Sequence, residues 1–308
     1  MDTQATEPSL DQVWAALATL RPQHVERVIS GGSTWVYRVS TREGLRYLRV
    51  LPEAGASFAP EALAHVRLSV AGVRLPQMLG WEAHSPLLGR STMLTAELPG
   101  RALAEHSGPL DRAALLAEAG RDLARVNGLP VSGFGWVVRD PLAEPGLRAP
   151  FANLRDWLDD ELRLPLAALA SSEMLGAAAV AALSAAISEL AGRVGAAPAC
   201  LAHGDLDPTH IFVEAGRYSG LIDFGEIRGA HQCYDLGHFA VEHSALLPEL
   251  LAGYADVGPL PADAARQIAL TAQLIAARRV GLRLASGRAP HPPDLAALQD
   301  LRIVQRKG

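Results

Sequence analysis

Residues 203–213 read HGDLDPTHIFV, and DFG follows at residues 223–225. The first stretch places two histidines and two aspartates in one short loop, and a third aspartate stands ten residues beyond it. Loops between strands commonly carry such residues singly, as caps and turn formers. This combination instead indicates a site that handles a metal ion and phosphate, with a strand–turn–strand hairpin between its two parts.

The spacing is similar to that of the protein-kinase catalytic loop, H-R-D-L-x-x-x-N, which D-F-G follows beyond a hairpin. His203, Asp205 and Leu206 occupy the first positions, and His210 stands where the asparagine would. An imidazole can ligate a metal ion, although Mg²⁺ prefers oxygen ligands. A polar hairpin without chemistry is the alternative, and the joint occurrence of these residues at this spacing argues against it.

The similarity extends over nearly the whole chain, through GGSTWVYRV at 31–39, LTAELPGRAL at 94–103 and CYDLGHF at 233–239. On these motifs the chain resembles the aminoglycoside phosphotransferase family, the small-molecule branch of the kinase-like fold, which has HGD where protein kinases have HRD. His210 resembles the branch of that family, including some aminoglycoside and macrolide kinases, that carries histidine at the metal-binding position.

The resemblance implies a role for each residue of the loop. Asp205 would be the catalytic base, and His210 and Asp223 would ligate Mg²⁺. Asp235 resembles the buried aspartate that braces the catalytic loop in the family, with an ordinary aspartate at a helix N-terminus as the alternative. His203 would support the loop through hydrogen bonds.

The first hundred residues contain candidate nucleotide-binding residues. A turn around Gly32 and Ser33 would let backbone N–H groups approach phosphate oxygens. Alternation in the strand RYLRV puts Arg49 among apolar neighbours, where a cation needs a partner. Glu61, on the next expected helix, resembles the glutamate that pairs with the kinase lysine. Arg49 in place of lysine departs from protein kinases, and a surface ion pair unrelated to ligand is the alternative.

The segment LTAELPG resembles the hinge of the family, where backbone groups from Ala96 to Leu98 would hydrogen-bond the purine. Backbone recognition leaves little trace in the side chains, so the choice between ATP and GTP stays open. The resemblance therefore implies Mg²⁺ as a cofactor and ATP or GTP as the phosphate donor.

The acceptor is less defined. The expected helix at 151–164 carries Trp157, Asp160 and Glu161, and Glu226 follows the DFG segment. These acidic side chains would suit a cationic acceptor such as an aminoglycoside, and a solvated helix face is the alternative. A macrolide would need a larger apolar pocket, and a choline-like amine would need an aromatic cage. Family membership alone leaves the acceptor open.

The order of elements predicts an α+β, bilobal protein-kinase-like fold. Strands are expected at 25–29, 35–40, 45–51, 77–81 and 91–98, with helices at 10–20 and 58–70. Helices are then expected at 112–126, 151–164, 173–194, 244–256 and 262–286, with a hairpin at 211–222 and a last short helix after the loop SGRAPHPPD at 286–294. We therefore expect a β-rich nucleotide-binding lobe at 1–98 and a helical catalytic and substrate-binding lobe at 99–308.

Composition limits the class of protein. The chain of 308 residues is 49% hydrophobic and 20% charged, as in soluble globular proteins. A net charge of −5 and dispersed arginines argue against nucleic acid or a membrane surface as the main partner. Cys200 and Cys233 lack metal or redox spacing, and the N-terminus lacks a signal-peptide pattern, so a cytoplasmic protein is expected. Monomer and homodimer are equally open.

These features predict an enzyme that moves the γ-phosphate of ATP or GTP to a hydroxyl group of a small molecule. An antibiotic is the expected acceptor, with an aminoglycoside ahead of a macrolide. One alternative is a metabolic kinase that acts on a sugar, an amino alcohol or an amino acid. A catalytically weak nucleotide-binding regulator is another, motivated by Arg49 and His210 and opposed by the intact Asp205 and Asp223.

Overall fold

Two units of secondary structure make up the fold, and each draws on separate parts of the sequence. The structure is a computed structural model that describes residues 6–29, 34–140, 146–172 and 174–300. The first unit, which we call the sheet unit, comprises Met1–Gly108, Val137–Leu147 and Thr209–Gly225. The second, the helical unit, comprises Pro109–Trp136, Arg148–Pro208 and Glu226–Gly308. The α+β class predicted from the sequence is confirmed, and the lobe boundary between residues 98 and 99 stays a prediction.

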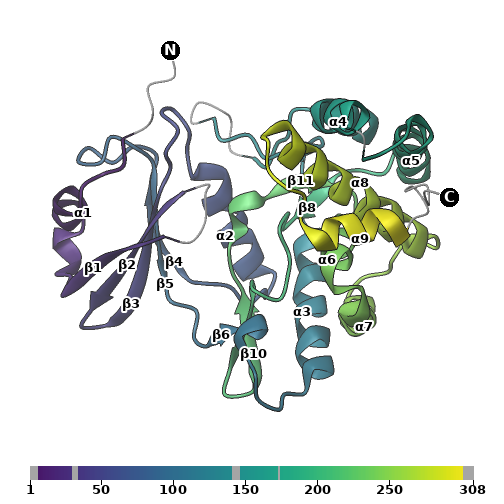
Figure 1. Ribbon diagram of the computed structural model, residues 1–308. Coiled ribbons are helices and arrows are strands. Elements are labelled where there is room, and N and C mark those ends of the chain that lie inside the picture. Colours follow the sequence, from purple (N-terminus) through teal and green to yellow (C-terminus); the bar gives the residue numbers. More distant parts are fainter. Residues whose placement is uncertain (1–5, 30–33, 141–145, 173, 301–308) are drawn as a thin grey trace. The chain divides into compact units, whose positions relative to one another are not determined.

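The sheet unit is built on a five-stranded antiparallel sheet. Its strands are, in spatial order, β1 (His24–Val28), β2 (Trp35–Thr41), β3 (Gly44–Val50), β5 (Thr92–Ala96) and β4 (Met78–Glu82). The helices α1 (Leu10–Ala16) and α2 (Ala59–Val70) lie on opposite faces of this sheet (Figure 1). These elements confirm the strands and helices predicted for this part of the sequence, apart from differences of a few residues at their ends.

Alternation along β3 gives the two faces of the sheet different characters. Leu48 and Val50 are buried on the side of α1, together with Tyr37 and Val39 of β2. Arg49 points to the opposite face, because successive side chains of a strand alternate. Its guanidinium carbon lies 5.2 Å from the centre of the Phe58 ring. The sheet therefore presents a cation on the face that α2 covers.

A second, three-stranded sheet of this unit contains the hairpin that leads from the HGD loop to the DFG motif. The hairpin of β9 (Ile211–Glu214) and β10 (Arg217–Leu221) is joined by β6 (Arg101–Ala102), which pairs with β9. Ala215 and Gly216 form its turn with φ angles of 48° and 76°, as a two-residue type I′ turn requires. The hairpin predicted from the sequence is confirmed, and His210 and Asp223 stand at its two ends.

The helical unit combines helices with a small sheet. The helices are α3 (Arg112–Asn127), α4 (Leu154–Ser171), α5 (Ala177–Val194), α6 (Tyr234–His243), α7 (Leu247–Ala255), α8 (Ala264–Ala285) and α9 (Pro292–Asp300). The sheet consists of β7 (Gly135–Trp136), β11 (Arg228–Ala230) and β8 (Cys200–Ala202), in that order. Because β8 ends at residue 202, the HGD loop begins directly at the edge of this sheet.

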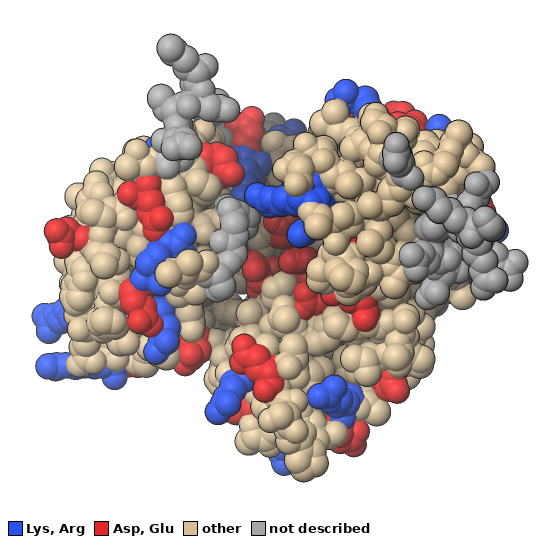
Figure 2. All heavy atoms as spheres, in the orientation of Figure 1, with Lys and Arg blue, Asp and Glu red and all other residues tan. Residues whose placement is uncertain are grey.

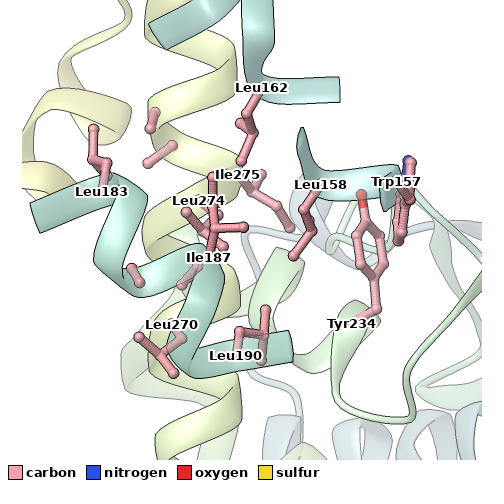
Figure 3. Close-up of a cluster of buried hydrophobic side chains, with 14 of the residues drawn as sticks. Trp157, Leu158, Leu162, Leu183, Ile187, Leu190, Tyr234, Leu270, Leu274 and Ile275 are labelled. Carbon is pink, nitrogen blue, oxygen red and sulfur yellow. The ribbon is translucent and has the colours of Figure 1, made fainter. Parts of the chain in front are cut away.

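The core of the helical unit surrounds α8. Aliphatic side chains from α4, α5 and α8 interdigitate there (Figure 3): Leu158, Leu162, Leu183, Ile187, Leu190, Leu270, Leu274 and Ile275. By length and composition alone, α5 could cross a membrane, with a mean hydropathy of 1.4. Its leucine and isoleucine stripe instead packs against α8, so its apolar composition has a structural reason within this unit.

One helix lies where the sequence predicted none. α6 covers the YDLGHF motif, whereas the prediction began the next helix at residue 244. Gly237, a weak helix former, stands in its middle. A Cβ on Gly237 would lie 2.5 Å from Cβ of Thr271 on α8. The glycine is therefore explained by the close approach of α6 and α8, which the local sequence does not reveal.

The contact between α3 and α7 gives a stability prediction. A Cβ on Gly253 of α7 would lie 1.8 Å from the carbonyl oxygen of Ala117 on α3. We expect Gly253→Ala to lower the free energy of unfolding by about 1–3 kcal/mol, because the blocking atom belongs to the backbone. Gly192→Ala in α5, where a Cβ meets nothing within 4 Å, should instead raise it by roughly 0.5–1 kcal/mol. Urea unfolding of both variants checks this, and equal effects would contradict it.

Candidate active site

A buried carboxylate on α6 holds the backbone of the HGD loop. Asp235 is fully buried and accepts hydrogen bonds from the N–H groups of His203 at 2.9 Å and Gly204 at 2.8 Å. The Nδ2 of Asn127 donates to Oδ2 of Asp235 at 3.0 Å and to the carbonyl of Leu201 at 2.9 Å. These contacts fix successive positions of the loop and of the strand that leads into it. The bracing role that the resemblance implies for Asp235 thus has a structural basis.

Gly204 explains why this loop has glycine where protein kinases have arginine. Its φ is +89°, a conformation that side chains rarely adopt. A Cβ at this position would lie 1.9 Å from the carbonyl oxygen of Glu226. A side chain at residue 204 would therefore force the loop away from the segment that follows DFG.

Asp205 lies on the accessible side of the braced loop. Its side chain is 41% exposed, so a hydroxyl group can approach the carboxylate. Its backbone N–H donates to Nδ1 of the buried His203 at 3.3 Å, which fits a supporting role for that imidazole. Oδ1 of Asp205 lies 3.3 Å from Nε2 of His238 on α6. The loop therefore combines a fixed backbone with an exposed carboxylate.

In the sheet unit, Arg49 of β3 forms an ion pair with Glu61 of α2. Glu61 is 2% exposed and also faces Arg139, whose Nη2 lies 3.9 Å from Oε2 of Glu61. Arg139 donates to the carbonyl of Gly225, next to Asp223, at 2.7 Å. The pair predicted from the sequence is thus formed, and it lies inside the unit rather than at its surface.

The electrostatics of this pair favour a charged guanidinium. Burial works against the charge of Arg49, but the carboxylates of Glu61 and Asp223 more than offset it and raise the pKa of Arg49 above its ordinary value. Burial raises the pKa of Glu61, and the charges of Arg49 and Arg139 oppose that rise. The Nη2 of Arg49 is buried and has no hydrogen-bond partner among the described residues. Buried donors of this kind are uncommon, so Nη2 suits an anionic ligand.

Asp223 and His210 come together at the ends of the β9–β10 hairpin. The N–H of Ile222 donates to the carbonyl of His210 at 3.0 Å, and Oδ2 of Asp223 lies 3.9 Å from Nε2 of His210. Asp223 has a φ of +63°, and its side chain is 50% exposed. Its Oδ1 lies 4.0 Å from Nη2 of Arg49. The carboxylate and the imidazole are close enough to share one cation.

A cavity of about 670 Å³ adjoins these residues within the sheet unit. Its lining includes Arg49 and Asp223 together with Thr34, Val36, Tyr47, Met93 and the segment from Ala96 to Leu98. The volume is within the range of ligand pockets, about 300–1,000 Å³. Gly32 and Ser33, predicted to approach the phosphates, lie outside the described residues.

The predicted hinge lines the cavity with its backbone partly engaged. The N–H of Ala96 donates to the carbonyl of Gln77 at 2.8 Å, and the N–H of Glu97 donates to the carbonyl of Leu45 at 3.1 Å. These two N–H groups are therefore already used in hydrogen bonds to neighbouring backbone. Leu98, which follows them, also lines the cavity.

The residues predicted to bind the acceptor lie in different surroundings. Trp157 is 2% exposed in the helical core, with its ring centre 5.6 Å from that of Tyr234, so its expected substrate contact is replaced by packing. Asp160 is exposed on α4, whereas Glu161 is half-buried and pairs with Arg278. Glu226 is half-buried and accepts a hydrogen bond from Arg228 at 3.3 Å.

Three residues of the site were not identified from the sequence. Asn127 contacts Asp235, Arg139 contacts Glu61, and His238 contacts Asp205. Asn127 had been interpreted as a helix-end signal only, and Arg139 stands in a loop without a motif. His238 had a usable signal, because it follows Asp235 by three residues on what proved to be a helix, where that spacing places both on one face.

Two buried histidines make stability depend on pH. Burial lowers the pKa of His65 and of His231 to about 4, and the charge of Arg49 adds to the effect at His65. Because an unfolded histidine titrates near pH 6.5, the native state binds fewer protons between pH 4 and 6.5. Stability therefore falls as the pH drops through this window, by about 2 kcal/mol per histidine at pH 5.

Urea unfolding at pH 7.5 and pH 5.0 tests this dependence. His231→Gln should reduce the difference between the two conditions by about 2 kcal/mol, because glutamine takes up no proton. The exposed His24 provides the matched control, and His24→Gln should leave the difference unchanged. An unaltered pH difference in His231→Gln would show that His231 is not the titrating group.

Comparison with known proteins places this geometry in a family. The sequence pattern of the phosphotransferase enzyme family matches residues 24–266, which is most of the chain. No curated protein is significantly similar in sequence.

Solved structures share the kinase-like fold. One is the aminoglycoside phosphotransferase APH(4)-Ia, with 16% identity, a TM-score of 0.69 and coverage of 94% of this chain and 96% of that one. Another is a putative fructosamine-3-kinase from Thermobifida fusca YX-ER1, with 19% identity, a TM-score of 0.65 and coverage of 96% and 99%. The macrolide 2′-phosphotransferase MphH from Brachybacterium faecium has 18% identity, a TM-score of 0.60 and coverage of 97% and 99%.

The family match covers both the sheet unit and the helical unit, and it includes the HGD loop, the β9–β10 hairpin and the DFG segment. The predicted resemblance is thereby confirmed, whereas the branch with histidine at the metal position stays a prediction. The chain therefore belongs to the phosphotransferase enzyme family and is a small-molecule kinase with a hydroxyl group as acceptor.

Proposed function

We propose that this protein transfers the γ-phosphate of ATP or GTP to a hydroxyl group of an aminoglycoside. The observation that carries the nucleotide part is the buried Nη2 of Arg49, which has no hydrogen-bond partner among the described residues and borders a cavity of about 670 Å³. Related structures support a nucleotide donor, since APH(4)-Ia was solved with ADP and hygromycin B, and APH(2″)-IIia with GDP and kanamycin.

Arg49 would hold the nucleotide phosphates. Its Nη1 pairs with Glu61, which leaves the planar guanidinium oriented with Nη2 toward an incoming oxygen. Guanidinium groups bind phosphate oxygens with fixed geometry, unlike the point charge of lysine. The second cation, Arg139, keeps Glu61 from swinging toward solvent. Arg49 stands where protein kinases have lysine, and its guanidinium would offer the phosphate a pre-oriented hydrogen-bond donor.

The donor set at the hairpin ends fits Mg²⁺ when phosphate completes it. Mg²⁺ sites in phosphotransferases commonly use one or two carboxylates together with substrate phosphates. Asp223 supplies such a carboxylate, and His210 stands 3.9 Å from it. These two residues would hold the ion, which would neutralise charge on the phosphate oxygens.

Asp205 would accept the proton of the acceptor hydroxyl. As the acceptor oxygen bonds to the γ-phosphorus, the bond from that phosphorus to the bridging oxygen breaks, and the nucleoside diphosphate leaves with the electron pair. The hydroxyl proton moves to the carboxylate of Asp205. His210 follows Asp205 by five residues, so the chain keeps their Cα atoms within about 18 Å of one another.

The hinge would recognise the purine through Leu98. The N–H groups of Ala96 and Glu97 already donate to carbonyls of neighbouring strands. Leu98 therefore offers the next backbone donor along the cavity, with the carbonyls of the segment as acceptors. ATP and GTP present opposite hydrogen-bonding edges to such a backbone, so competition between the two nucleotides tests this contact.

The acceptor assignment rests on carboxylates that suit a cationic sugar. Glu226 is held by Arg228, whose guanidinium carbon lies 4.1 Å from the ring centre of Trp136 and 5.1 Å from that of Tyr234. This packing fixes the Glu226 carboxylate for an ammonium group. On the face shown in Figure 2, acidic and basic side chains are interspersed on both units, unlike the single-sign field that favours nucleic acid.

The test is transfer of labelled γ-phosphate from ATP and from GTP, with Mg²⁺, to aminoglycosides, macrolides and small metabolic alcohols. We expect label on an aminoglycoside, and we expect Asp223→Asn to abolish its transfer. Asp256→Asn, which changes an exposed aspartate paired with Arg121, is the matched control and should keep full activity. Label on a macrolide or on a small metabolic alcohol would replace the acceptor assignment. Nucleotide binding without transfer to any acceptor would favour a regulator.

A further inference from the structure

We propose that Arg279 of α8 is a positioning residue that holds His238 in its neutral, Nδ1-protonated form, so that this imidazole does not donate a hydrogen bond to the carboxylate of Asp205. The inference rests on the proposed role of Asp205 as the catalytic base. All three residues, and every contact used below, belong to the helical unit.

The imidazole of His238 is buried between the HGD loop and α8. Its Nδ1 lies 3.2 Å from the carbonyl oxygen of Leu206, the residue that follows Asp205. Its Nε2 lies 2.7 Å from Nη2 of Arg279 and 3.3 Å from Oδ1 of Asp205. The ring therefore has one carbonyl acceptor at Nδ1, and both a donor and a carboxylate at Nε2.

The chemistry of the two neighbours decides where the proton resides. A guanidinium only donates, so Nε2 must offer its lone pair to Arg279. A carbonyl oxygen only accepts, so Nδ1 must carry the hydrogen and donate it to Leu206. In this neutral form Nε2 has no hydrogen for Asp205. His238 therefore does not compete with the acceptor hydroxyl for the carboxylate of Asp205.

Carboxylates on two other helices hold Arg279 in place. Its Nη1 lies 2.9 Å from Oε1 of Glu242 on α6 and 3.3 Å from Oδ1 of Asp294 on α9. Burial raises the pKa of Asp294, and the charge of Arg279 opposes that rise. Glu242, His291 and Asp294 are close enough together to hold a metal ion, but the guanidinium already supplies the positive charge. With Nη1 anchored in this way, Nη2 is aimed at His238.

Loss of Arg279 would allow His238 to become a cation that donates a hydrogen bond to Asp205. Without the guanidinium, Nε2 can take a second proton and donate it to Asp205, which forms a charge-assisted hydrogen bond. The carboxylates around His238 then favour a cation: Asp205 on the loop, Asp235 and Glu242 on α6, and Asp294 on α9. The other titratable group beside them, His291, carries no negative charge and adds nothing to this preference. An imidazolium there would compete with the acceptor hydroxyl for Asp205.

The pH profile of phosphate transfer separates this role from simple support. Arg279→Met keeps the stem but removes the donor and the charge. We expect the acid limb of the profile to move up by roughly one pH unit, so that kcat falls about tenfold at pH values well below the limb and is unchanged on the plateau above it, with the nucleotide KM unchanged. Arg279→Lys should restore the profile, and adding His238→Gln to Arg279→Met should remove the shift.

Arg266→Met is the matched control, because Arg266 stands on the same helix and pairs with Glu189. It should leave the acid limb in place. An equal loss of kcat at every pH in Arg279→Met would overturn the proposal and leave Arg279 a structural residue.

Nitrogen NMR of the histidine side chains gives a readout that needs no activity. At pH 7 we expect the Nδ1–H tautomer of His238 in the unaltered protein and an imidazolium in Arg279→Met. Any other form of His238 in the unaltered protein overturns the proposal. If no acceptor is phosphorylated, the proposed function fails, while the NMR result still decides the role of Arg279.

Discussion

Asp205→Asn is expected to lower kcat by about 10³-fold and to leave the affinity for nucleotide unchanged. The amide has nearly the shape of the carboxylate but accepts no proton, so the acceptor hydroxyl loses its base. The N–H groups of His203 and Gly204 donate to Asp235, which Asn127 holds, and the N–H of Asp205 donates to His203, so these contacts are retained in the variant. Single-turnover phosphate transfer gives the chemical step, and nucleotide-dependent stabilisation against heat gives the binding.

The same loop offers a matched control for Asp205→Asn. Asp207 lies two residues further along and is half-buried. Asp207→Asn makes the same chemical change and should alter kcat less than tenfold, because the family resemblance assigns the base to residue 205 and not to residue 207. Equal losses in the two variants would mean that loop charge, rather than a proton acceptor at residue 205, supports the reaction. Full activity of the Asp205→Asn protein would show that Asp205 is not the base that accepts the proton of the acceptor hydroxyl.

The predictable parts of the site were those set by short-range spacing. The hairpin over 211–222 could be predicted because its strands and its turn occupy consecutive residues, and it brings His210 and Asp223 together. Alternation in a strand placed Arg49 among apolar neighbours, and the resemblance to kinases pointed to Glu61, twelve residues on, as its partner. Local periodicity thus determines where the strand side chains point, and the resemblance supplied the pairing.

The remaining contacts join residues that no local pattern connects. Asn127 and Asp235 are 108 residues apart in sequence, and His238 and Arg279 are 41 apart. Their meeting depends on how α3, α6 and α8 pack, which in turn depends on close approaches such as the one at Gly237. Trp157 shows the converse error, since a large aromatic residue on a helix with acidic neighbours was assigned to the substrate but packs inside the core.

Asp235 carries the largest expected effect on stability. We expect Asp235→Ala to lower the free energy of unfolding by roughly 4 kcal/mol, because it leaves the N–H groups of His203 and Gly204 and the amide of Asn127 without their buried acceptor. Each unsatisfied buried donor costs about 1–3 kcal/mol. Asp263→Ala, which removes a partly buried carboxylate that pairs with Arg193 and accepts a hydrogen bond from Gln267, should lower stability by only about 1 kcal/mol.

Asp235→Asn distinguishes lost hydrogen bonds from lost charge. The amide oxygen can still accept from one backbone N–H, but its NH₂ group then faces the other donor, so we expect a loss between those of the two alanine variants. Urea unfolding of all three proteins, with circular dichroism as the probe, measures the series. If Asp235→Ala failed to fold, the asparagine variant would still give a value. Losses below about 1 kcal/mol in both variants would show that the HGD loop holds its conformation without this brace.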